Sequence, residues 1–208
     1  MSNSHTRRIS ITDLTARKVR GEKWAMITSY EEMTASIFDS CGIPVLLVGD
    51  SAGNNFLGEE NTIPVTLEQI IMLASSVVRG SKNAMVVADL PFGSYEESPK
   101  LALESATRLF KEAKVQAVKV EGGEKVAPQI KKLIESGIPV MGHLGLTPQS
   151  VYALGGFKVQ GRGAAALTIM HDALALQEAG VFALVLELVP AELAAEIAGA
   201  LHIPVIGI

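Results

Sequence analysis

Leu46-Leu47-Val48-Gly49-Asp50-Ser51-Ala52-Gly53 is the stretch that decides the fold, because an apolar run stops at an acid and a small, turn-prone segment follows. Continuous apolar runs are typical of strands that are buried on both faces of a parallel sheet. Asp50 therefore stands where such a strand leaves the core and opens into a loop. In barrels of alternating strands and helices, the active site lies at that end of the strands.

The same pattern returns twice, in Val86-Val87-Ala88-Asp89 and in Val118-Lys119-Val120-Glu121, each followed by a turn. Neighbouring strands lie about 4.8 Å apart, so three successive strand ends bring three carboxylates into one place. Three anions that gather in this way surround a cation. The pattern predicts a metal site made of Asp50, Asp89 and Glu121, although each acid taken alone is more typical of a cap or a salt bridge than of a metal ligand.

Composition limits the classes of protein to consider. The chain has 208 residues, 48% of them hydrophobic, which predicts a single domain over residues 1–208 with one core. The net charge is −4 and no Lys/Arg cluster is present, which argues against nucleic-acid binding. No apolar run reaches the length of about 18 residues that spans a membrane. Cys41 is the only cysteine, which favours a reducing, cytoplasmic location; we interpret it as a small core residue.

Seven apolar segments of strand length alternate with amphipathic segments. We expect strands at 24–28, 45–49, 84–88, 117–120, 139–142, 182–186 and 204–208, and helices that begin near residues 12, 31, 66, 98, 127, 147, 165 and 190. This alternation favours parallel strands with crossover helices. An eight-stranded barrel needs about 250 residues, so the chain stops about one strand-helix unit short. A doubly wound sheet is the alternative, but no G-x-G-x-x-G follows the first strand.

Several local features carry expectations of their own. Thr12 is predicted to cap the first helix and Thr147 the sixth. The second helix is predicted to bury a stripe made of Met33, Ile37 and Cys41. The glycine-rich segment 155–163 is either a mobile lid or a surface connection.

The three acids offer hard oxygen ligands, which suit Mg²⁺, and no zinc-type His/Cys spacing occurs. Lys119 points to the same side of its strand as Glu121. A lysine there needs an anion, either an anionic substrate or Glu121 itself. Glu187 ends a later strand and is a candidate general base, or else a buried acid paired with a lysine or arginine. His143 also stands at a strand end, where a structural hydrogen-bonding role is the more common one.

Six segments resemble the ketopantoate hydroxymethyltransferase (3-methyl-2-oxobutanoate hydroxymethyltransferase) family. They are Val-Gly-Asp-Ser at 48–51, Ala-Asp-Leu-Pro-Phe-Gly-Ser-Tyr at 88–95, Val-Lys-Val-Glu-Gly-Gly at 118–123, Gly-His-Leu-Gly-Leu-Thr-Pro-Gln-Ser at 142–150, Gly-Gly-Phe-Lys-Val-Gln-Gly-Arg at 155–162 and Leu-Glu-Leu-Val-Pro at 186–190. The resemblance covers residues 21–208. It implies a (β/α)8 TIM barrel of the phosphoenolpyruvate mutase-like group that binds Mg²⁺, assembles as a homodecamer and acts in pantothenate biosynthesis.

By this resemblance, Asp50 and Asp89 are direct metal ligands that also contact the substrate, and Glu121 acts on the metal through water. The implied reaction transfers a hydroxymethyl group from 5,10-methylenetetrahydrofolate to 3-methyl-2-oxobutanoate and gives 2-dehydropantoate. It implies further roles for single residues: Ser51 and Lys119 contact the substrate, Glu187 accepts the proton, and His143 lines the site.

The chain departs from the family pattern at Ser29, at Glu31 and at residues 54–56, which affects the packing of loops and leaves the metal site intact. The family continues beyond Ile208 with an eighth strand. We therefore expect these residues to be part of a longer chain and to aggregate when they are expressed alone, because two sheet edges would be open. Two alternative functions remain: a Mg²⁺-dependent 2-oxo acid lyase of the phosphoenolpyruvate mutase/isocitrate lyase group, and a non-catalytic barrel that builds an oligomer.

Overall fold

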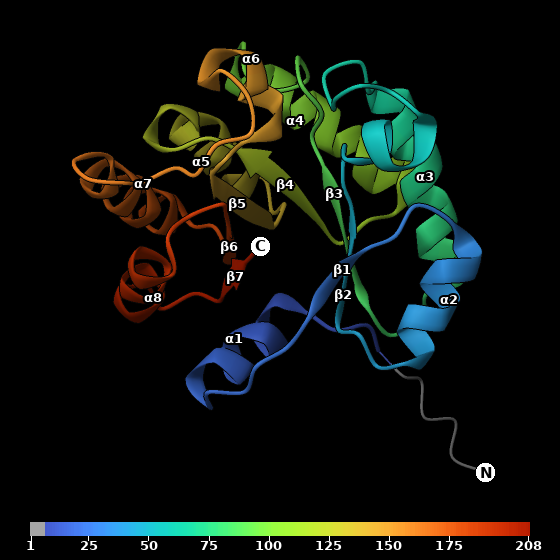
Figure 1. The fold of residues 1–208 in the computed structure, drawn as a ribbon. Coiled ribbons are helices and arrows are strands. Elements are labelled where there is room, and N and C mark those ends of the chain that lie inside the picture. Colours follow the sequence, from blue (N-terminus) through green and yellow to red (C-terminus); the bar gives the residue numbers. More distant parts are fainter. Residues whose placement is uncertain (1–6) are drawn as a thin grey trace.

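The protein, seen here as a computed structural model that describes residues 7–208, is built on one seven-stranded sheet (Figure 1). All neighbouring strands are parallel and follow the chain in the order β1-β2-β3-β4-β5-β6-β7. The strands are β1 Met26–Thr28, β2 Val45–Val48, β3 Met85–Asp89, β4 Ala117–Glu121, β5 Val140–Gly145, β6 Ala183–Glu187 and β7 Val205–Gly207. The prediction of seven parallel strands in a barrel that is not fully closed is confirmed.

Helices cover the outer side of this curved sheet, and α1 lies below it in Figure 1. They are α1 Ile11–Val19, α2 Glu32–Ser40, α3 Leu67–Gly80, α4 Pro99–Arg108, α5 Ala127–Glu135, α6 Val151–Leu154, α7 Ala165–Ala179 and α8 Ala191–Ala200. Short turns of other helix types occur at η1 Gly53–Leu57, η2 Leu109–Ala113, η3 Glu124–Val126 and η4 Pro148–Ser150. Within residues 7–208, none of the helices has the length and apolar character needed to cross a membrane.

The residues that cap the helices agree only in part with those expected from the sequence. Thr66 caps α3, where Gln69 completes a capping box. The prediction for Thr12 is wrong: Ser10 caps α1, because its hydroxyl and the carboxylate of Asp13 bond to each other's backbone N–H groups. The prediction for Thr147 is also wrong, since its side chain makes no cap bond and the chain first forms η4 before α6 begins.

The predicted buried stripe on α2 is wrong. Met33 and Ile37 are 72% and 53% exposed, and Cys41 is exposed as well. The helix buries its opposite side, through Ala35 and the partly buried Phe38. The exposed stripe and the buried stripe both have helical spacing. The stripe that contains the small Ala35 faces inward because α2 packs closely against α3.

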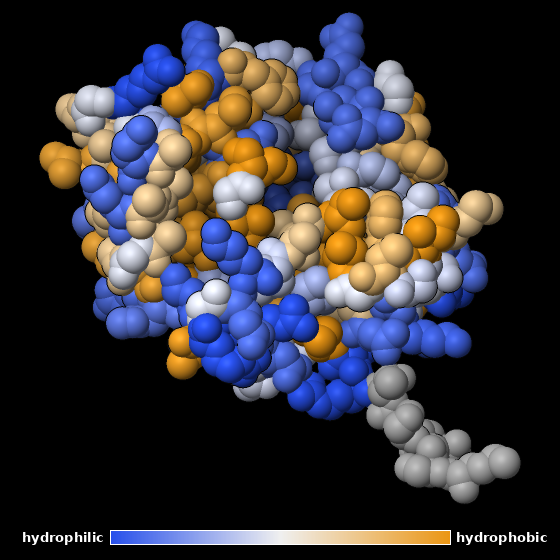
Figure 2. Space-filling model, turned by 60° about the horizontal axis from the view of Figure 1, so that its bottom comes forward, coloured by the Kyte–Doolittle hydropathy of each residue, from blue (hydrophilic) through white to orange (hydrophobic). Residues whose placement is uncertain are grey.

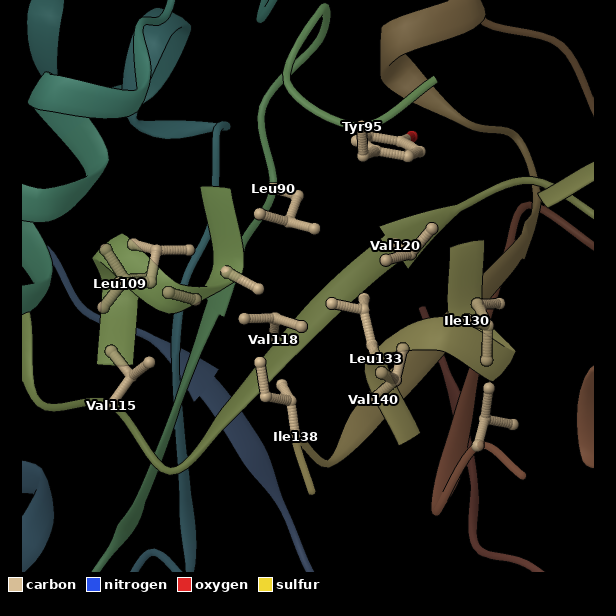
Figure 3. Close-up of a cluster of buried hydrophobic side chains, with 14 of the residues drawn as sticks. Leu90, Tyr95, Leu109, Val115, Val118, Val120, Ile130, Leu133, Ile138 and Val140 are labelled. Carbon is tan, nitrogen blue, oxygen red and sulfur yellow. The ribbon is translucent and has the colours of Figure 1, made fainter. Parts of the chain in front are cut away.

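The apolar residues of the strands form two layers. Side chains such as Leu46, Val86 and Val118 face outward against the helices, and Figure 3 shows part of this layer, in which Val118 and Val140 lie beside helix residues such as Leu133. The alternate residues face inward and fill the barrel together with Leu14 of α1: Val45, Leu47, Met85, Val87, Ala117, Met141, Ala183 and Val185. The two-residue period of each strand therefore decides which side chains reach the barrel interior.

The barrel is open between its first and last strands. An open groove lined by residues 21–26 of the segment leading into β1 and residues 204–207 of β7 separates these two edges. Figure 2, in which the bottom of Figure 1 is turned forward, shows a hollow on this side of the molecule with apolar residues on its border.

Candidate active site

The inward layer of side chains changes from apolar to charged at the carboxyl ends of the strands. Asp89, Glu121 and Glu187 are the last residues of β3, β4 and β6, and Asp50 follows β2 by two residues. The register pairs Asp89 with Lys119 and Glu121 with His143. A pocket of about 440 Å³ is lined by all of the residues that the sequence singled out: Asp50, Ser51, Asp89, Lys119, Glu121, His143 and Glu187. The structure brings these residues together, and their roles stay predictions.

Each of the three candidate ligands has one carboxylate oxygen held by the protein. Oδ2 of Asp50 accepts a hydrogen bond from Nε2 of Gln149 at 2.7 Å. Oδ2 of Asp89 accepts one from the backbone N–H of Asp50 at 3.0 Å. Oε2 of Glu121 accepts one from the backbone N–H of Gln149 at 3.1 Å. These contacts fix the orientation of all three carboxylates.

The second oxygens of Asp89 and Glu121 lie next to basic side chains. Oδ1 of Asp89 and Oε1 of Glu121 are buried, and neither accepts a hydrogen bond. Lys119 Nζ lies 3.1 Å from the first and 3.5 Å from the second, which are ion-pair distances without hydrogen-bond geometry. The salt bridge between Lys119 and Glu121, which the sequence left as an alternative, is therefore present, and Asp89 shares the lysine.

These oxygens suit a divalent cation. Mg²⁺ commonly uses one or two carboxylates and completes its coordination with water or substrate oxygens. In the described residues, no three His, Cys, Asp or Glu side chains converge on one point as a ready ligand set. The direct roles of Asp50 and Asp89 and the water-mediated role of Glu121 therefore stay predictions.

The pKa values show where positive charge is lacking. Burial, followed by the charges of Asp89 and Glu121, raises the pKa of Asp50 to about 8. Burial also raises the pKa of Asp89, against the opposing charge of Lys119. Burial acts in the same direction on Glu121, but Lys119 and His143 outweigh it and hold its pKa below the usual range. The lysine thus compensates Glu121 best and leaves a deficit of positive charge beside Asp50.

His143 connects two acids across the pocket. Its Nε2 lies 3.3 Å from Oε2 of Glu187, and its Nδ1 lies 3.2 Å from Oε1 of Glu121 and 3.1 Å from Lys119 Nζ. Burial and Lys119 oppose protonation, but the bonds to Glu121 and Glu187 outweigh them and raise the pKa of His143. Glu187 therefore has a histidine as its partner, in place of the lysine or arginine considered from the sequence.

Gly145 sets the position of Glu187. The two residues are paired in the β5–β6 register, and Gly145 has a φ of +91°. A Cβ atom at this position would collide with the carbonyl oxygen of Glu187. A glycine is therefore required where the ends of these strands approach each other.

The loop after β2 places Ser51 at the rim. Its hydroxyl lies 2.9 Å from the hydroxyl of Tyr30, whose ring packs against Phe56 of η1 at a centroid distance of 5.8 Å. Glu31 caps α2 by accepting the backbone N–H of Thr34 at 2.7 Å. Among the positions where the chain departs from the family pattern, Glu31 and Phe56 thus act in local packing, whereas Asn54 and Asn55 line the same pocket as the three acids.

Two buried residues that the sequence analysis did not single out belong to this site. Gln149 contacts Asp50 and Glu121, and the Tyr95 hydroxyl donates to Oε1 of Gln149 at 2.7 Å. Both lie inside the segments 88–95 and 142–150 that carry the family resemblance. Their position within those segments was the only signal, since neither is an acid, a base or a usual metal ligand.

Comparison with known proteins agrees with this geometry. The family model for ketopantoate hydroxymethyltransferase matches residues 8–208. A 3-methyl-2-oxobutanoate hydroxymethyltransferase of Streptomyces avermitilis is 64% identical over 204 residues, which cover 98% of this chain and 71% of that protein. The protein of the same name from Streptomyces coelicolor is 63% identical over 203 residues, covering 97% of this chain and 69% of the relative.

Solved structures support the fold. Oxaloacetate acetylhydrolase in complex with 3,3-difluorooxalacetate superimposes with a TM-score of 0.70 at 11% identity, covering 97% of this chain and 72% of that one. Phosphonopyruvate hydrolase in complex with oxalate and Mg²⁺ gives a TM-score of 0.65 at 12% identity, covering 95% and 79%. At such low identity these likenesses show a shared barrel fold, whereas the family match extends to the sequence itself. The chain belongs to the ketopantoate hydroxymethyltransferase family.

Proposed function

We propose that this protein transfers a hydroxymethyl group from 5,10-methylenetetrahydrofolate to 3-methyl-2-oxobutanoate, giving 2-dehydropantoate for pantothenate biosynthesis, and that it does so with Mg²⁺. The relatives at 63–64% identity carry the name of this transferase. The observation that carries the proposal is the set of carboxylates at the strand ends, each held by the protein through one oxygen.

Asp50 and Asp89 would hold the metal directly, and Glu121 would hold one of its waters. A bound Mg²⁺ supplies positive charge that draws electrons from the keto group of a 2-oxo acid and so favours loss of the proton at C3. Lys119 lies among the same acids and offers a fixed ammonium group to the negative charge that develops on the substrate oxygens. Ser51, at the rim of the pocket, contacts the substrate.

Glu187 takes the proton from C3 in this proposal. Its carboxylate lines the pocket and is partly exposed, so it reaches a bound substrate, and Nε2 of His143 lies 3.3 Å from Oε2. A base that is oriented by a neighbour and faces the substrate meets the geometric requirement for general-base catalysis. The resulting enolate carbon then bonds to the methylene carbon of the folate as one C–N bond breaks. Water supplies the hydroxyl group as the second C–N bond breaks, and tetrahydrofolate leaves as the other product.

The lyase alternative has weaker support. Solved 2,3-dimethylmalate lyase shares the fold with a TM-score of 0.63, but at 15% identity. The hydroxymethyltransferase relatives are about four times as similar in sequence. Likeness to the lyase therefore reflects the common barrel, and the pocket residues follow the transferase pattern.

We also propose that the protein is cytoplasmic and forms a homo-oligomer, a decamer as the family resemblance implies. The single cysteine, Cys41, is exposed and forms no disulfide, which suits a reducing compartment. Met33 and Ile37 on α2 and Met72 on the adjacent α3 are exposed apolar side chains, and such side chains often meet a partner chain.

Replacing the metal ligands tests the proposed chemistry. With Mg²⁺, 3-methyl-2-oxobutanoate and methylenetetrahydrofolate, the protein should form 2-dehydropantoate, and Asp50→Asn or Asp89→Asn should abolish this turnover. Both variants should also bind Mg²⁺ more weakly in calorimetry, whereas Glu121→Gln should keep weak binding because its carboxylate acts through water. Glu124→Gln, which removes an exposed acid outside the pocket, is the control. Unchanged Mg²⁺ affinity in Asp89→Asn would contradict the assignment.

Glu187 can be tested without folate, because loss of the C3 proton does not need the one-carbon donor. In D₂O with Mg²⁺, the protein should exchange the C3 hydrogen of 3-methyl-2-oxobutanoate for deuterium. Glu187→Gln should lower the exchange rate by about 10²- to 10⁴-fold, with Mg²⁺ and substrate binding retained. Exchange followed by proton NMR at the parent rate in this variant would show that the base is another residue.

Light scattering coupled to size-exclusion chromatography tests the oligomer. The expected mass is a multiple of the chain mass, and Ile37→Glu should lower it because a charge would be buried at the subunit contact. A parent protein that elutes with the mass of one chain at micromolar concentration is the result that would refute assembly.

A further inference from the structure

Gln149 is a buried polar side chain whose amide bonds to Asp50, Leu90 and Tyr95. It lies in η4, just beyond β5, and is 6% exposed. Its Nε2 donates to Oδ2 of Asp50 at 2.7 Å and to the carbonyl oxygen of Leu90 at 3.0 Å. Its Oε1 accepts the Tyr95 hydroxyl at 2.7 Å, and its backbone N–H donates to Glu121 at 3.1 Å. All polar atoms of this side chain are thus satisfied inside the protein.

The chemistry of these partners fixes which way the amide faces. The carboxylate of Asp50 and the carbonyl of Leu90 only accept hydrogen bonds, so the NH₂ end must face them. The phenol of Tyr95, with an ordinary pKa of about 10, keeps its proton and donates to the oxygen end. Tyr95 is itself buried beside Leu90, and Figure 3 shows its hydroxyl pointing away from that leucine.

We propose that Gln149 is the positioning residue of the metal site, oriented by Tyr95, and that it makes Asp50 and Glu121 present their Oδ1 and Oε1 atoms to the cation. One residue supplies two of the three contacts that hold the acids: its side chain holds Asp50 and its backbone holds Glu121. This inference rests on the proposed Mg²⁺ site, and extends it to residues that would not touch the ion.

Fixing the carboxylates matters because they repel one another. In this buried site, the charges of Asp89 and Glu121 raise the pKa of Asp50. A carboxylate held through one oxygen cannot turn away to relieve this repulsion, so its free oxygen remains in place for the metal. Residues that orient metal ligands in this way typically change metal affinity or activity by about 10- to 100-fold when they are replaced.

The matched test compares two buried glutamines. Gln149→Met removes the side-chain bonds at nearly constant volume. Gln129→Met is the control, because Gln129 is 7% exposed, lies on α5 and donates only to the carbonyl oxygen of Glu96. In calorimetry with Mg²⁺ alone, Gln149→Met should bind about 10- to 100-fold more weakly, and Gln129→Met should bind as the parent does. Thermal unfolding should be cooperative in both variants.

Tyr95→Phe gives a second measurement that leaves Gln149 in place. The Tyr95 hydroxyl also contacts the carbonyl oxygen of Glu121 at 3.1 Å. Tyr95→Phe should weaken Mg²⁺ binding severalfold in the parent and less in Gln149→Met, because part of its effect acts through the Gln149 amide. If Gln149→Met does not fold, Tyr95→Phe decides the question alone. If Gln149→Met folds and binds Mg²⁺ as tightly as the parent, this inference is wrong. If Gln149→Met does not fold, the same result in Tyr95→Phe would overturn it. A parent protein that binds no Mg²⁺ would overturn the proposed function itself.

Discussion

The barrel buries more negative than positive charge at the carboxyl ends of its strands, and the arrangement of the pocket residues depends on this imbalance. Asp50, Asp89 and Glu121 are buried next to the apolar interior, and the ammonium group of Lys119 pairs with Asp89 and Glu121. Burying unpaired charge is costly, so every one of these acids is tied to a protein N–H group on one side. The remaining deficit of positive charge at this end of the barrel is what the proposed cation would offset.

The sequence predicted the parts of this arrangement that follow from strand periodicity. Asp89, Glu121 and Glu187 end apolar strands, and a period of two keeps them on the same face as the inner core residues, as Glu121 follows Ala117 and Lys119. Asp50 lies beyond the end of β2, outside this period, and reaches the pocket from the loop. Parallel pairing in chain order then brings the strand ends together. The fold and the pocket residues could therefore be predicted without any coordinates.

Other features depend on contacts that no local pattern contains. The stripe of Met33 and Ile37 has the spacing of a buried face, but tertiary packing selected Ala35 instead. The cap at Ser10 depends on a reciprocal bond with Asp13. Gln149 reaches Asp50, 99 residues away in the chain, and its role arises only when the loops after β2, β3 and β5 meet. A neutral amide carries no sequence signal for metal chemistry.

The most direct test of this account is the position of a divalent cation in a crystal of the parent protein, with Mn²⁺ in place of Mg²⁺ so that anomalous scattering locates it. The account predicts an ion bound to Oδ1 of Asp50 and Oδ1 of Asp89, with Gln149 still donating to Oδ2 of Asp50. An ion bound away from these two oxygens, or one that displaces Gln149 from Asp50, would contradict it.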